Sequence, residues 1–168
     1  MSKRAAVIAV MMLGGALSLS CSSGKNSGEF LTKAAQGGMA EVQLGRMVVE
    51  RAQNAAVKQF GQHMIDDHTK SNSELTRLAG QKNVTLPQEV NSDQKSEMDK
   101  LSKLTGADFD KEYIQYMVKD HEEDVEEFQK QANDGTDADV KTFAAKTLPT
   151  LQSHLQMARD VAKVVGAK

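Results

Sequence analysis

Three of the four histidines in this chain fall on the inward-facing positions of three different expected helices. Around His68, His121 and His154, apolar residues recur every three or four positions, and each histidine stands where that pattern expects a buried side chain. Burying an imidazole without a hydrogen-bond partner costs about 1–3 kcal/mol, so the interior must hold partners for these rings. Glu41 occupies the equivalent position on a fourth expected helix. Each long helix therefore contributes one polar group to the interior.

Two interpretations of these four residues remain open. Three neutral imidazole nitrogens and one carboxylate are typical ligands of a single divalent ion such as zinc, iron or copper, and helical bundles build metal sites from inward-facing side chains. Alternatively, Glu41 can accept a hydrogen bond from an N–H of each of two rings. In that case the four residues form a buried network that only fixes how the helices align.

Methionines stand one helical turn from each of the three histidines. Met64 lies four residues before His68, Met117 four before His121, and Met157 three after His154. Soft thioether ligands beside imidazole would favour copper, Cu(I) in particular. The alternative is that these flexible side chains simply fill gaps in the apolar core. The fourth histidine, His63, stands one position off the inward-facing stripe and is predicted to be exposed.

The sequence favours a protein without catalytic activity. A di-iron oxidase needs bridging carboxylates three residues before its histidines, where this chain has Ile65, Val118 and Leu151. A metal-dependent oxidase is therefore the least favoured of three functions, behind a binding or stress-related envelope protein and a structural or interaction module. The chain also has no Gly-rich phosphate loop and no serine or cysteine placed as an activated nucleophile.

The remaining acidic residues are predicted to lie outside the metal site. Asp67 and Asp120 directly precede histidines, and adjacent helical residues point about 100° apart, so neither is expected to share a metal-binding face. We expect them to be hydrogen-bond partners of the histidines or solvated charges. The acidic run over residues 120–127 lacks the spacing of a calcium loop and is predicted to be a solvated helix surface.

Composition and periodicity predict an all-α fold that positions these residues. The chain has two prolines and no tryptophan, and many of its residues are strong helix formers. The expected class is an antiparallel four-helix bundle, ferritin-like, with a short extra helix in the crossover between the second and third long helices; a simple up-down bundle is the alternative. Gly37, Gly38 and Gly45 are expected to make space around Glu41, and Pro149 to kink the last helix without ending it. The expected helices cover residues 29–52, 55–81, 92–104, 108–132 and 137–165. Ser92 is expected to cap the short helix over residues 92–104.

The N-terminus is typical of an exported bacterial protein. Residues 1–20 combine positive charge with an apolar stretch too short to span a bilayer, which predicts a removable signal peptide. Cys21 stands at the expected cleavage point and is predicted to carry a lipid that anchors the chain to the membrane. Ser22 after it favours the outer membrane. Residues 21–28 are expected to form a flexible tether and residues 29–168 the folded domain. Ordinary cleavage, leaving a soluble periplasmic protein, is the alternative.

A net charge of −2 leaves no basic surface for nucleic acid, and the sequence specifies no protein partner.

Several motifs between residues 29 and 165 resemble those of a known family of ferritin-like bacterial envelope proteins, the domain of unknown function 4142. The resemblance implies the ferritin-like fold and an envelope location, but no settled activity. It rests on the Glu41 helix, Met64-Ile-Asp-Asp-His68, Leu86-Pro87, Phe109-Asp110, Tyr116-Met-Val-Lys-Asp-His121 and Leu148-Pro-Thr-Leu-Gln-Ser-His154.

Overall fold

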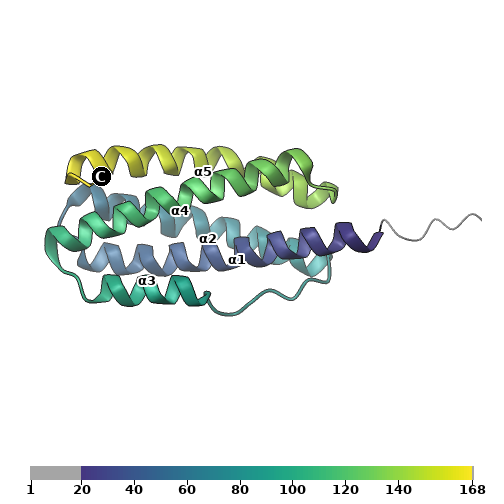
Figure 1. Ribbon diagram of the computed structural model, residues 1–168, viewed down its shortest axis with the longest axis horizontal. Coiled ribbons are helices and arrows are strands. Elements are labelled where there is room, and N and C mark those ends of the chain that lie inside the picture. Colours follow the sequence, from purple (N-terminus) through teal and green to yellow (C-terminus); the bar gives the residue numbers. More distant parts are fainter. Residues whose placement is uncertain (1–19, 168) are drawn as a thin grey trace, which may run out of the picture.

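The computed structural model describes residues 20–167, with side chains from Asn26 onward. Within that range the chain forms five helices and no strand, which confirms the all-α class: α1 (Ser20–Arg51), α2 (Ala55–Gln81), α3 (Ser92–Ser102), α4 (Gly106–Asp134) and α5 (Ala138–Val165). The four long helices lie side by side, and α3 lies along one flank (Figure 1). The link after α2 returns along the length of the molecule, so α2 and α4 run in the same direction (Figure 1). No helix in this part of the chain is long and apolar enough to cross a membrane.

The first helix is longer than the sequence pattern predicts. It begins at Ser20 rather than at residue 29, so residues 21–28 are helical and do not form the expected flexible tether. The helix gains contacts in this region, because Ser27 is buried and Phe30 packs edge-to-face on Phe128, with 4.9 Å between the ring centres. A helix that has nucleated extends at little cost. The expected signal peptide lies outside the described residues except for Ser20.

A reciprocal pair of hydrogen bonds sets the start of the short helix α3. Asn91, rather than the expected Ser92, caps α3: its side chain accepts from the Gln94 N–H, and the Gln94 side chain accepts from the Asn91 N–H. The link to the next helix is short, because Thr105 is the N-cap residue of α4 and Gly106 its first residue. The last helix continues through Pro149, as expected.

A buried carboxylate fixes the turn between α1 and α2. Asp110 of α4 is only 3% exposed and accepts hydrogen bonds from the backbone N–H groups of Gln53 at 3.2 Å and Asn54 at 2.8 Å. Asn54 in turn caps α2 by accepting from the Ala56 N–H. The two hydrogen bonds that Asp110 accepts tie the start of α4 to the turn between α1 and α2.

Small residues let α1 and α2 approach closely. A Cβ atom on Gly45 would stand 2.8 Å from the carbonyl oxygen of Gly61, and a Cβ on Gly38 would overlap the side chain of Asn72. Gly37 has open space around it, so the expectation that it makes room for a neighbour is wrong. The close contact brings the backbone around Glu41 against α2.

The interior consists of two apolar clusters separated by a polar layer. Along every long helix, one polar residue stands between the two clusters: Glu41 in α1, His68 in α2, His121 in α4 and His154 in α5. The four helices therefore bring their polar groups to a common depth. The first cluster contains Phe30, Leu31, Ala35, Leu75, Leu78, Ala79, Phe128, Val140, Phe143, Ala144, Leu148 and Leu151. The second contains Leu44, Val48, Ala52, Val57, Phe60, Met64, Leu101, Phe109, Tyr113, Ile114, Met117 and Ala158.

Candidate metal centre

The three inward-facing histidines meet inside the bundle. The ring centres of His68, His121 and His154 lie 5.2–5.9 Å apart, and one nitrogen from each ring lies within 4.8 Å of the others. All three rings are at most 6% exposed. Glu41 is also buried, but its carboxylate groups with His121 and Asp120 rather than with all three rings. The four predicted ligands therefore lie together, with the carboxylate on one side of the imidazoles.

Two of the rings are oriented by carboxylates from other helices. His68 donates its Nδ1–H to Glu41 Oε2 at 2.7 Å, and His154 donates its Nε2–H to Asp67 Oδ2 at 3.0 Å. The opposite nitrogens, His68 Nε2 and His154 Nδ1, are buried without a hydrogen-bond partner. Asp67 is thus a hydrogen-bond partner of a histidine, one of the two roles expected for it. Histidines that bind metals are typically held in this way, by an acceptor on the nitrogen that does not face the ion.

The third ring is oriented by the backbone. His121 Nδ1 lies 3.0 Å from the carbonyl oxygen of Met117, which can only accept, so Nδ1 carries the hydrogen. In the neutral ring, Nε2 is then an acceptor, and it faces Glu41 Oε1, another acceptor, at 3.3 Å. Neither atom has a hydrogen-bond partner. Two buried acceptors that face each other repel unless a proton or a cation lies between them.

The electrostatics of the cluster leave the free nitrogens of His121 and His154 unprotonated. Burial lowers the pKa of His121 to about 4 and also lowers the pKa of His154. Burial would raise the pKa of Glu41, but its contact with His68 outweighs this and lowers the pKa, while the same contact raises the pKa of His68 against its own burial. Near neutral pH, Glu41 is therefore an anion, and His121 and His154 are neutral rings with lone pairs available to an ion.

Part of the acidic run on α4 points inward, contrary to the sequence expectation. An Asp120 oxygen lies within 4.8 Å of ligand atoms of Glu41 and His121, although Asp120 and His121 are adjacent in α4. Side chains several ångströms long can converge on a group presented by a facing helix, even when their Cβ atoms point about 100° apart. Asp124, one turn further on, is half-buried, and burial together with Glu41 raises the pKa of both aspartates. Glu126, in contrast, is exposed as expected.

The methionines lie in or beside the apolar core. Met64 and Met117 are fully buried in the second apolar cluster, and Met157 packs half-buried against it. This burial is what ordinary packing requires, so their role as soft metal ligands stays a prediction. His63 is exposed, as expected.

A small cavity borders the cluster on the side of the first apolar cluster. It has a volume of about 20 Å³, room for about one water molecule, and its lining includes Glu41, His68, Asn72 and Asp124. The polar layer therefore includes a small hollow lined by polar side chains beside the imidazoles.

Solved structures share this fold at low sequence identity. A DUF305 fragment from Deinococcus radiodurans has a TM-score of 0.71 at 14% identity, covering 83% of this chain and 95% of that one. A DUF305 protein from Streptomyces coelicolor, described as secreted, has a TM-score of 0.69 at 17% identity, covering 83% and 91%. CopM in its Cu(II)-bound form has a TM-score of 0.69 at 12% identity, covering 82% and 95%. At these identities the similarity shows the fold alone.

No curated protein matches the chain. A family model, however, matches residues 19–161, which include every residue of both apolar clusters and all four residues of the polar layer. The matched segment carries every motif on which the sequence resemblance rests. The chain therefore belongs to the family DUF4142, a domain of unknown function.

Proposed function

We propose that this protein binds one divalent transition-metal ion through His68 Nε2, His121 Nε2 and His154 Nδ1. One observation carries the proposal: each ring has one nitrogen fixed by an acceptor and the other buried without a partner. Leaving a buried polar atom unpaired costs about 1–3 kcal/mol, and here three such atoms occur in one cluster. An ion bound to three imidazoles would satisfy all of them.

The geometry is compatible with zinc or copper. Zinc–nitrogen bonds of about 2.0–2.1 Å place tetrahedral ligand atoms about 3.4 Å apart. One nitrogen of each ring lies within 4.8 Å of one nitrogen of each other ring, so an ion that bound this set would draw the ligand atoms together by no more than about 1.4 Å. Imidazole suits Zn(II) and Cu(II), and CopM, which shares the fold, has been solved with Cu(II) bound. If Met64 or Met117 also binds, exchanging it for leucine should weaken Cu(I) binding and leave Zn(II) binding unchanged.

We propose further that the protein works in the bacterial envelope, as an antiparallel four-helix, ferritin-like bundle. The apolar stretch at the N-terminus and Cys21 support export and lipid attachment, with the outer membrane as the destination and the periplasm as the alternative. A DUF305 protein of the same fold is described as secreted. The mass of the protein in the membrane fraction should include a lipid that the Cys21→Ser variant lacks. An unmodified soluble wild-type chain would contradict the anchor.

The metal site is tested by calorimetric titration of metal-free protein with zinc and with copper. We expect one ion per chain, and a free energy of unfolding raised by about 2.7 kcal/mol when free zinc is a hundred times Kd. Replacing His68, His121 and His154 together by alanine should abolish binding. His63→Ala removes an exposed histidine from the same helix as His68 and should bind like wild type. Absence of stoichiometric binding, or equal binding by the triple variant, would contradict the metal site.

The network interpretation remains the second candidate because two of the hydrogen bonds join different helices. The bond between His68 and Glu41 links α2 to α1, and the bond between His154 and Asp67 links α5 to α2. Such bonds fix the relative alignment of the helices with or without an ion. This candidate predicts that removing the polar layer disrupts the fold itself.

A further inference from the structure

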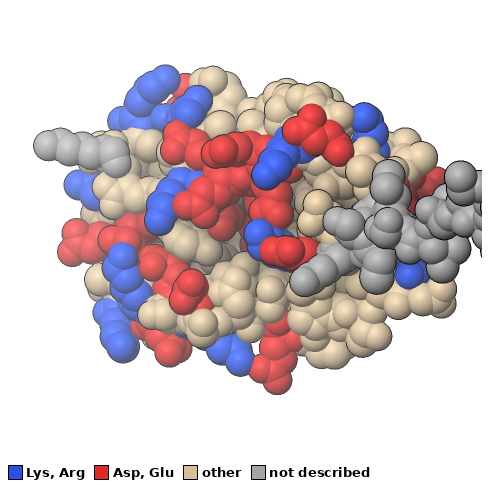
Figure 2. Space-filling view, turned by 45° about the vertical axis from the view of Figure 1, so that its right-hand side comes forward, with Lys and Arg blue, Asp and Glu red and all other residues tan. Residues whose placement is uncertain are grey.

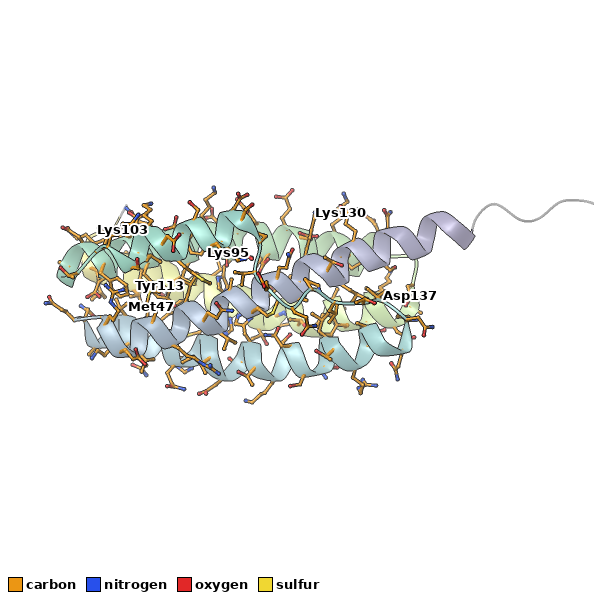
Figure 3. The ribbon with its side chains drawn as sticks, turned by 90° about the horizontal axis from the view of Figure 1, so that it is seen from below. Met47, Lys95, Lys103, Tyr113, Lys130 and Asp137 are labelled. Carbon is orange, nitrogen blue, oxygen red and sulfur yellow. The ribbon has the colours of Figure 1, made fainter. Side chains whose placement is uncertain are left out.

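A cleft rich in carboxylates opens between α3 and α4. Its volume is about 650 Å³, and two lysines and five carboxylates line it: Asp93, Glu97, Glu112, Asp120 and Glu123. Acidic side chains gather across the middle of the face that α4 occupies (Figure 2). Figure 3 shows α3, which carries Lys95 and ends just before Lys103, along the flank of the bundle. Tyr113 of α4 belongs to the second apolar cluster, and Met47 of α1 packs against that cluster. The cleft therefore presents negative potential to solvent beside the core.

Asp120 connects this cleft to the interior. It lines the cleft, and an oxygen of its carboxylate lies within 4.8 Å of ligand atoms of Glu41 and His121. Glu41 is 1% exposed and His121 is fully buried, and Glu41 Oε1 and His121 Nε2 both lack a hydrogen-bond partner. Behind the acidic cleft, two unpartnered acceptors thus stand next to a carboxylate that the cleft reaches.

We propose that Glu41, Asp120 and His121 form a second cation position at the inner end of the cleft, and that ions reach the three histidines through it. This inference rests on the proposed metal site. The outer position offers two carboxylates and one imidazole, whereas the inner one offers three imidazoles. A single lone pair on His121 Nε2 holds one ion at a time, so the two positions are alternatives for the same ion. The ion exchanges carboxylate oxygens for imidazole nitrogens as it moves inward, and its oxidation state does not change.

The access route is tested by the rate at which the full chain takes up Zn²⁺ from a zinc-sensitive chromophore. Glu123→Lys reverses the charge of an exposed side chain in the cleft. Glu126→Lys makes the same change on the same helix at an exposed residue outside the cleft lining. We expect the cleft variant to slow association about tenfold and to weaken its dependence on ionic strength, because charged clefts steer ions. The control should stay close to wild type.

The outer position is tested by Asp120→Asn, which keeps the size of the side chain. If the ion contacts Asp120 on its way in and on its way out, losing that carboxylate should slow zinc association and zinc dissociation by a similar factor. We expect each rate to fall at least fivefold, while Kd changes less than threefold. Unchanged rates in this variant would overturn the outer position, and equal slowing by Glu123→Lys and Glu126→Lys would overturn the route. Failure of the wild-type chain to bind zinc would instead refute the three-histidine site itself.

Discussion

Removing His68 should destabilise the metal-free protein mainly by leaving the Glu41 carboxylate without its partner. Glu41 is 1% exposed and accepts the His68 hydrogen bond at 2.7 Å. In a His68→Leu variant, the buried carboxyl is expected to take up a proton. Its pKa in the unfolded chain is 4.5, so holding the proton at pH 7 costs about 3.4 kcal/mol at 1.36 kcal/mol per pH unit. Breaking a buried ion pair typically costs about 3–5 kcal/mol, which agrees with this figure.

The double variant Glu41→Leu/His68→Leu removes that cost. Replacing both members of a buried pair by apolar residues is often neutral or stabilising. We therefore expect the double variant to be about 3–4 kcal/mol more stable than His68→Leu at pH 7. In the single variant the folded-state pKa of Glu41 is raised, so stability returns as the pH falls toward 4.5. The difference in free energy of unfolding between the double variant and His68→Leu should therefore shrink by about 2 kcal/mol between pH 7 and pH 5.5.

The assay is urea denaturation followed by far-UV circular dichroism, with a chelator present so that no ion contributes. Both variants lack His68, so the pH dependence of the difference between their free energies of unfolding reports the titration of Glu41. A gap that does not change with pH would refute the reasoning, because it would mean that Glu41 keeps its charge through another partner such as His121. A double variant that fails to fold would favour the network interpretation over a site selected for metal binding.

Three further predictions follow from the packing and the titrating groups. Asp110→Ala leaves two partly buried backbone N–H groups, those of Gln53 and Asn54, without their acceptor and should lower the free energy of unfolding by about 1–3 kcal/mol in urea denaturation, whereas Asp110→Ser should cost less. Gly45→Ala should lower stability by about 1–3 kcal/mol in thermal denaturation, because the added Cβ meets the Gly61 carbonyl, whereas Gly37→Ala should raise it by up to about 1 kcal/mol. The pKa of His121 falls from 6.5 in the unfolded chain to about 4 in the folded one. The stability that the neutral His121 ring contributes is therefore complete above pH 6.5 and is lost as the pH falls toward 4. Denaturation at pH 6.5 and pH 5 should show wild type losing about 2 kcal/mol more than His121→Phe, and equal losses would contradict the assignment.

The depth of the polar layer could be predicted from the sequence because each of its residues interrupts an apolar repeat on its own helix. Glu41, His68, His121 and His154 all occupy such positions, and helices of similar length that lie side by side bring them together. The helix starts were less predictable. Asn91 and Ser92 are both good caps, and only the reciprocal bond with Gln94 selects Asn91.

The contacts that orient the rings could not be read from residue spacing. The Met117 carbonyl is available as an acceptor only because the His121 side chain turns back along its own helix, and the bond between Asp67 and His154 depends on how α2 packs against α5. Cβ directions alone predict that Asp120 stands off the metal-binding face of its helix, as a hydrogen-bond partner of a histidine or a solvated charge. Its carboxylate reaches inward, where Glu41 extends from the facing helix. Such convergence depends on side-chain length and rotamer, which periodicity does not encode.

The separation of the apolar interior into two clusters has a consequence for how the molecule opens. Each half of the core can loosen with little effect on the other, because direct apolar contact between the halves is interrupted at the same level in every long helix. An ion held by rings from α2, α4 and α5 would join the two halves. Amide hydrogen exchange in metal-free protein should then show two blocks that open at different free energies, and adding zinc should make them open together.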